Sequence, residues 1–150
     1  MPGNIRIIEA TESDLPAIVA LLSELVDTVD SREGLDIAVA TENVSTLLHS
    51  PACYLLVAKD GSDVVGCISF AVRRTALHDG LSGLIDEMVV LRSSRGSGVG
   101  RQLVQAAAET CRHLGCIELE VSTEKTNRAA RRFYRQCGFK EDAVQLEMQL

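Results

Sequence analysis

The chain has 150 residues, a length that suits one domain with a single continuous core. Hydrophobic residues make up 46% of it and charged residues 24%, a balance that excludes an intrinsically disordered chain. The net charge of −6 and an aromatic content of only 3% argue against a nucleic-acid-binding surface. No apolar run approaches the roughly 20 residues that cross a bilayer, and no signal-peptide pattern is present, so we expect a cytoplasmic protein without membrane or nucleic-acid partners.

The first third of the chain predicts a strand followed by two helices. Residues 5–8 are rich in isoleucine and open a short strand. Residues 11–14 resemble a capping box, and apolar residues at helical spacing follow over 15–26. A second helix is expected over 41–48, and Pro51 limits its extension.

Beyond residue 53, the apolar pattern indicates a hairpin, a third strand, a helix, a strand, a last helix and a terminal strand. In that order, the elements cover residues 54–58, 64–73, 84–91, 103–114, 117–121, 129–137 and 143–150. The whole chain, residues 1–150, is therefore predicted to be one α/β domain around a single mixed sheet, with the order β-α-α-β-β-β-α-β-α-β.

Cysteine and charge patterns bear on the ligands to be expected. The five cysteines are odd in number and form no C-x-x-C pair, so we expect free thiols and no bound metal. Nine basic and only four acidic residues lie between Arg92 and Arg135, which leaves the rest of the chain strongly acidic. This basic region favours a local anionic ligand, although a solvated arginine-rich helix face would give the same count.

The glycine-rich segment over 95–100 lies between a strong strand and a strong helix. Glycines allow the backbone to approach a ligand closely, and free N–H groups at the start of a helix point toward an anion. A P-loop requires Gly-Lys at the position that Arg101 occupies, and a dinucleotide-binding fingerprint requires its third glycine there. Glu120 has the spacing of that fingerprint's ribose-binding acid, but too little chain follows for a doubly wound sheet. Both nucleotide-binding interpretations therefore fail.

What remains is the pattern [QR]-x-x-G-x-[GA] directly after a strand, filled by Arg95, Gly98 and Gly100. Asn127, Tyr134 and the pair Gly138-Phe139 follow at fixed spacings. Over residues 84–139 the sequence resembles the GNAT-type N-acetyltransferases, which bind the pyrophosphate of acetyl-CoA at such a loop. Residues 85–100 and 120–125 look most like aminoalkylphosphonate and aminoglycoside N-acetyltransferases. The resemblance implies the single mixed-sheet GNAT fold.

The resemblance also implies roles for individual residues. The backbone of residues 88–90 would pair with the pantetheine arm, and an amide such as that of Val89 would donate to the thioester carbonyl. The loop amides would hold the pyrophosphate, and Asn127 would hydrogen-bond the cofactor arm. Tyr134 would protonate the departing thiolate, and Arg128, Arg131 or Arg132 could approach a phosphate. The expected cofactor-binding residues are Met88, Val89, Val90, Arg95, Gly96, Ser97, Gly98, Val99, Gly100, Arg101 and Asn127.

The general base is ambiguous in the sequence. Positions that carry a catalytic glutamate in some family members are occupied here by Leu84 and Ser122. Asp86 and Glu87 match an acidic pair found in polyamine and glucosamine-phosphate acetyltransferases. Successive strand residues face opposite sides, so we expect only one of the two acids to face the amine. A partner role for a nearby arginine or helix N-terminus is the alternative.

We therefore expect a transfer of acetyl from acetyl-CoA directly to a primary amine, with Tyr134, Glu87 and Asp86 as the catalytic candidates. The acidic body of the chain favours a small cationic acceptor. Two alternatives stay open: a CoA-binding regulatory or interaction module without catalysis, and a protein or peptide N-acetyltransferase. Because family members are often dimers, the terminal strand could also pair across a homodimer interface.

Overall fold

A computed structural model describes residues 3–28 and 34–150 of the chain. A five-stranded sheet with the order β1-β2-β3-β4-β5 forms its centre. Neighbouring strands are antiparallel, except that β4 and β5 run parallel. The elements are β1 (Ile5–Glu9), α1 (Leu15–Thr28), α2 (Ile37–His49), β2 (Cys53–Asp60), β3 (Asp63–Arg74), β4 (Leu81–Val90), α3 (Val99–His113), β5 (Cys116–Val121) and α4 (Arg128–Gln136).

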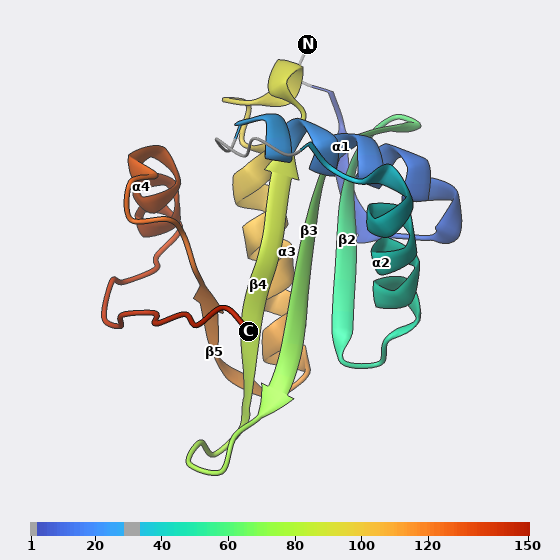
Figure 1. Cartoon of the computed structure of the whole chain (residues 1–150). Helices are drawn as coiled ribbons and strands as arrows, with labels where there is room; N and C mark the ends of the chain where they lie inside the picture. Colours follow the sequence, from blue (N-terminus) through green and yellow to red (C-terminus); the bar gives the residue numbers. More distant parts are fainter. Residues whose placement is uncertain (1–2, 29–33) are drawn as a thin grey trace.

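Helices cover both faces of the sheet (Figure 1). On one face, α1 and α2 place Ile18 and Val44 against the strand residue Val57. On the other face, α3 places Leu103 against Ile68 of β3. Both faces of the central strands therefore meet an apolar cluster, which explains why β2 and β3 are near-continuous apolar runs. The α/β class and the single mixed sheet expected from the sequence are confirmed.

A capping box at Thr11 starts the 3-10 turn Glu12–Asp14, which runs directly into α1, and it also supplies a buried ion pair. The backbone N–H of Thr11 donates to Oδ2 of Asp14 at 2.9 Å. Oδ1 of Asp14 lies 2.8 Å from Nζ of Lys59 on β2, and both side chains are largely buried. Burial by itself raises the pKa of the Asp14 carboxyl, but the hydrogen bond from Lys59 and the Thr11 contacts outweigh it and lower that pKa below its ordinary value.

Helix α2 begins at Ile37, earlier than the apolar spacing indicated. Asp36 is its N-cap, and Oδ1 of this residue accepts hydrogen bonds from the backbone N–H groups of Ala38 at 3.0 Å and Val39 at 3.2 Å. An Asp immediately before an apolar stretch is a recognised helix start. The start of α2 could therefore be predicted from Asp36, although the spacing of apolar residues alone placed it too late.

The terminal strand expected over 143–150 is wrong, because these residues lie in no helix or strand. The apolar residues alternate as a strand requires, but their exposed fractions are 79% for Val144, 90% for Leu146, 83% for Met148 and 112% for Leu150. Alternation specifies which side chains would share a face. A strand also needs a partner edge and a surface to cover, and no described strand of this chain pairs with the segment.

Two further features concern the described residues as a whole. Over 3–28 and 34–150, no helix is both long enough and apolar enough to cross a membrane. All five cysteines are free thiols, as expected.

Candidate active site

The parallel strands β4 and β5 pair only over the first half of β4. Residues Leu81 to Ile85 are matched with β5, whereas Glu87 to Val90 are matched with β3 alone. Figure 1 shows β5 diverging from β4 at this point. The second half of β4 therefore presents an open edge, where unpaired backbone N–H and C=O groups can bind an extended ligand.

Hydrogen bonds at the end of β4 indicate which backbone groups face the open edge. The N–H of Leu91 donates to the carbonyl of Val65 on β3 at 2.8 Å. The carbonyl of Val90 faces away from β3 and accepts from Nε of Arg95 at 3.0 Å. Because backbone groups alternate along a strand, Met88 also faces the open edge and Val89 faces β3. This differs from the expectation that placed a donor at Val89.

A β-bulge interrupts β4 at the two acidic residues. Ile85 is opposite Phe70 and Glu87 is opposite Ser69, so Asp86 has no opposite residue on β3. The extra residue shifts the alternation of faces along the strand. Ile85 therefore contacts the cluster under α3, while Glu87 lines a cavity on the side of α1 and α2.

Glu87 is held by a serine that the sequence analysis did not single out. The hydroxyl of Ser69 donates to Oε2 of Glu87, and the backbone N–H of Glu87 donates to Oγ of Ser69 at 3.2 Å. Ser69 is only 5% exposed. A lone hydroxyl within the apolar run over 64–72 was the available signal, since a buried polar side chain needs a partner.

Asp86 has a different environment from Glu87. Its carboxylate does not line the cavity, and within the described ranges it has no hydrogen-bond or ion-pair partner. Partial burial raises the pKa of this carboxyl above its ordinary value. Of the two acids, only Glu87 therefore lines the cavity.

The glycine-rich loop joins β4 to α3 through a left-handed backbone. Gly96 and Gly98 have φ angles of 76° and 88°, a region that L side chains disfavour. None of the backbone N–H groups from Gly96 to Arg101 donates to another described residue. Gly98 is the N-cap of α3, so these free donors gather at the positive end of a helix dipole of 15 residues.

Side chains around the loop fix its position. Glu24 of α1 accepts from the backbone N–H of Arg92 at 2.8 Å, and its Oε1 lies 3.7 Å from Arg95. Arg101 donates from its guanidinium to the carbonyl of Gln136 at 2.7 Å, which ties α3 to the end of α4. A Cβ at Gly100 would lie 3.2 Å from the ring of Phe133, so glycine permits this close crossing of the two helices.

Asn127 is the N-cap of α4. Its Oδ1 accepts from the backbone N–H of Ala130 at 3.0 Å. The carboxamide oxygen therefore accepts a hydrogen bond within the helix start. The NH₂ group of the same side chain has no hydrogen-bond partner in the part of the chain that the structure describes. Asn127 therefore caps the helix and still offers a donor beside it.

Tyr134 of α4 is 9% exposed and packs edge-on against Phe133 and Phe139, with ring centroids 5.1 and 5.5 Å away. Burial, together with the nearby Cys137, raises the pKa of its phenol to about 12. The hydroxyl has no hydrogen-bond partner among the described residues. Every fully buried side-chain oxygen of those residues does have a partner, so the Tyr134 hydroxyl is not fully buried. Its oxygen is therefore accessible to a ligand, and the phenol stays protonated at neutral pH.

An open β4 edge, a run of free amides and a buried phenol with an accessible oxygen occur at the residues for which the sequence resemblance implied acetyl-CoA binding. Residues 19–139 match a protein family described as the acetyltransferase (GNAT) family. The chain belongs to this GNAT acetyltransferase family. It is an acetyl-CoA-dependent N-acetyltransferase.

Two curated relatives and one solved structure illustrate the similarity. Aminoalkylphosphonate N-acetyltransferase of Salmonella typhimurium is 33% identical over 132 residues, which cover 88% of this chain and 82% of the relative. L-methionine sulfoximine/L-methionine sulfone acetyltransferase of Pseudomonas aeruginosa is 29% identical over 150 residues, covering 93% and 81%. An aminoglycoside N-acetyltransferase solved in complex with CoA has a TM-score of 0.86 at 16% identity, covering 100% of this chain and 97% of that one, which shows the shared fold.

The N-acetyltransferase also carries a basic surface on α4. A shallow cavity of about 570 Å³ is lined by Arg128, Ala129, Arg131, Arg132 and Arg135. Arg131 and Arg135 lie 2.9 and 3.2 Å from the Glu141 carboxylate, which neutralises part of this charge. Arg128 and Arg132 have no ion pair within the described residues, so they are the cations available to an anionic ligand.

Proposed function

We propose that this N-acetyltransferase transfers acetyl from acetyl-CoA directly to the primary amine of a small molecule. The observation that carries the proposal is the position of Glu87. This acid follows the bulge, so it lines a cavity on one side of β4 at the point where the open edge begins. An amine in the cavity and a thioester along the edge would meet at that point.

The cofactor has a matching surface at each of its parts. The free amides from Gly96 to Arg101 suit the pyrophosphate, because they combine several N–H donors with a helix N-terminus. Arg128 and Arg132 suit a further phosphate. The N–H of Met88 faces the open edge, so we assign to it the hydrogen bond to the thioester carbonyl.

The acceptor amine must lose a proton before it attacks. A model alkylamine has a pKa of about 10.4, so roughly one molecule in 2,500 is neutral at pH 7, a cost of about 4–5 kcal/mol. A carboxylate in the cavity attracts the ammonium form and receives or relays its proton. Glu87 lines the cavity and Asp86 does not, so we assign the role to Glu87.

Tyr134 suits the opposite end of the reaction. The amine nitrogen forms a bond to the carbonyl carbon, the C–S bond breaks, and the sulfur leaves as a thiolate that needs a proton. The phenol of Tyr134, with its pKa raised to about 12, is fully protonated near neutral pH and can supply a hydrogen bond and then the proton. Asn127 offers its free NH₂ group to the cofactor arm.

The test is thiol release from acetyl-CoA in the presence of a panel of small primary amines. We expect release above the amine-free rate for at least one amine, and a fall of about 10²-fold or more in Tyr134→Phe. Tyr54→Phe is the matched control, since Tyr54 stacks on Phe70 of β3 away from the loop. Tight CoA binding without turnover on any amine would contradict the proposal.

We also propose that the chain forms a homodimer through residues 143–150. The support is the exposed alternation of Val144, Leu146, Met148 and Leu150, which a second copy could bury as a strand. We expect the full chain to elute as a dimer and a chain ending at Asp142 to elute as a monomer in size-exclusion chromatography with light scattering. A monomeric full chain would contradict this proposal.

A further inference from the structure

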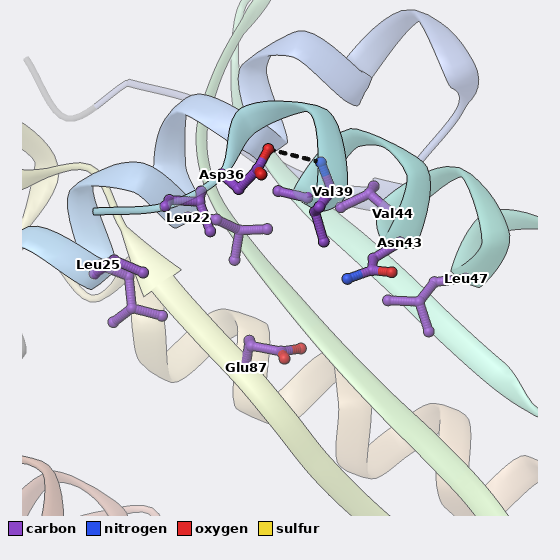
Figure 2. Close-up of a pocket in the computed structure, with 11 residues that line it drawn as sticks. Leu22, Leu25, Asp36, Val39, Asn43, Val44, Leu47 and Glu87 are labelled. Atoms are coloured by element: carbon purple, nitrogen blue, oxygen red, sulfur yellow. Dashed lines mark hydrogen bonds between the residues drawn. The ribbon is translucent and has the colours of Figure 1, made fainter. Parts of the chain in front are cut away.

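The cavity next to Glu87 is small and walled by hydrocarbon. It has a volume of about 270 Å³ and lies between α1, α2 and β4 (Figure 2). Its apolar walls include Leu22 and Leu25 from α1 and Val39, Val44 and Leu47 from α2. A cavity of this size suits a small acceptor group and not a large ligand.

Among the described residues that line the cavity, polar groups are few and none of them is cationic. The polar residues that line it are Asp36, Asn43 and Glu87, and no described lining residue is Lys, Arg or His. The Asp36 carboxylate already caps α2 through the N–H groups of Ala38 and Val39. The cavity therefore presents one acid at its floor, on β4, beneath leucine and valine side chains (Figure 2).

We infer that the acceptor is a small primary amine on a hydrocarbon arm, an alkylamine or arylalkylamine without a phosphate, phosphonate or polyhydroxyl group. The inference rests on the proposed function and names its substrate class. An ammonium group placed at Glu87 directs the rest of the molecule toward the leucines, where burial of apolar surface is favourable. A phosphonate there would be desolvated with no counter-cation from the described lining residues, a costly arrangement.

This substrate class differs from those named for two of the relatives. The aminoalkylphosphonate N-acetyltransferase is named for a substrate that carries an anionic group. So is an Oryza sativa relative named "Probable glucosamine 6-phosphate N-acetyltransferase 2", which is 29% identical over 149 residues that cover 95% of this chain and 85% of the relative. The likeness at 33% and 29% identity therefore does not extend to the acceptor, because acceptor choice depends on the cavity walls.

Substrate series of matched basicity provide the first test. Ethylamine, propylamine, butylamine and pentylamine have similar pKa values, so differences in kcat/KM report on the hydrocarbon arm. We expect kcat/KM to rise about fourfold per methylene until the cavity is filled. Pentylamine and 2-phenylethylamine should exceed 3-aminopropylphosphonate by at least tenfold. A flat series, or a preference for the phosphonate, overturns the inference.

A pair of variants on α2 locates the effect in the cavity. Val39 and Ile37 are exposed to nearly the same extent, 51% and 53%, and both lie in the first turn of α2, but only Val39 lines the cavity. We expect Val39→Lys to lower kcat/KM for pentylamine about tenfold and to raise it for 3-aminopropylphosphonate. Ile37→Lys, which adds the same charge outside the cavity, should change neither, and the KM for acetyl-CoA should stay constant in both variants.

The outcomes separate this inference from the proposed function. If no amine raises thiol release above the amine-free rate, the proposed function is refuted. Thiol release that is indifferent to chain length, or equal responses of Val39→Lys and Ile37→Lys, refutes only the substrate class. A rising alkylamine series together with a response confined to Val39→Lys supports both.

Discussion

Tyr134→Phe removes one oxygen from a side chain whose ring is packed on two others. The ring centroids of Phe133 and Phe139 lie 5.1 and 5.5 Å from that of Tyr134, and these contacts survive the substitution. The phenol donates no hydrogen bond to any described residue, so its loss leaves no partner unsatisfied. We expect an unfolding free energy within about 0.5 kcal/mol of wild type at pH 7.

The same substitution should change the response to alkali. Burial raises the pKa of the Tyr134 phenol to about 12 in the folded chain, against about 10 for an unperturbed tyrosine. Between these two pKa values the unfolded chain loses the phenol proton and the folded chain keeps it. The contribution of Tyr134 to the unfolding free energy is therefore complete below pH 10 and is lost as the pH rises through 12. The loss is about 1.4 kcal/mol at pH 11 and approaches 2.7 kcal/mol above pH 12. The Phe variant has no such loss.

The assay is urea unfolding of wild type and Tyr134→Phe at pH 8 and pH 11, combined with CoA titration and thiol release on the same preparations. We expect the variant to gain about 1.4 kcal/mol over wild type between the two pH values. CoA affinity should be nearly unchanged, while turnover should fall about 10²-fold or more. Full turnover in the variant would mean that water protonates the thiolate and that Tyr134 serves packing alone.

Three other substitutions test the loop, the acids and the fold. Gly98→Asp should weaken CoA binding at least tenfold more than Gly98→Asn, as measured by CoA titration. Both side chains are strained equally by the φ of +88°, but only the aspartate carries a negative charge that repels the pyrophosphate. Glu87→Gln should lower the rate near pH 7 and recover toward the pKa of the amine, whereas Asp86→Asn should leave the shape of the pH–rate profile unchanged; identical profiles for all three proteins would remove Glu87 as base. Lys59→Met should cost about 3–5 kcal/mol of unfolding free energy at pH 7, because it leaves the buried Asp14 carboxylate unpaired. That cost should shrink in denaturation at pH 3, where Asp14 without its partner takes up a proton.

Features that depend on local backbone geometry were predictable from the sequence. Gly96 and Gly98 of the loop adopt left-handed conformations, which glycine accepts more readily than other residues. Gly138 follows the end of α4 with a φ of 104°, and Phe139 then packs on Tyr134; a glycine followed by an apolar residue is a common helix end. Such motifs involve residues close in sequence, so their geometry is encoded where it is used.

Features that depend on the register between strands were not predictable. Ser69 and Glu87 are 18 positions apart and meet only because β3 and β4 pair around a bulge. Likewise, the apolar character of the cavity follows from the packing of α1 on α2, which the periodicity of either helix leaves undetermined. The error over residues 143–150 has the same origin, since a correct alternation does not supply a partner edge.

The bulge at Asp86 links the two halves of the proposed site. Ile85 faces the cluster under α3, so regular alternation would direct Glu87 into that apolar cluster as well. The extra residue instead turns Glu87 toward the cavity between α1 and α2. Pairing with β5 ends at Ile85, immediately before the bulge, and bulges bend the strand that carries them. One inserted residue therefore places the acid next to the open edge, and the meeting point of amine and thioester follows from strand geometry as much as from the chemistry of either acid.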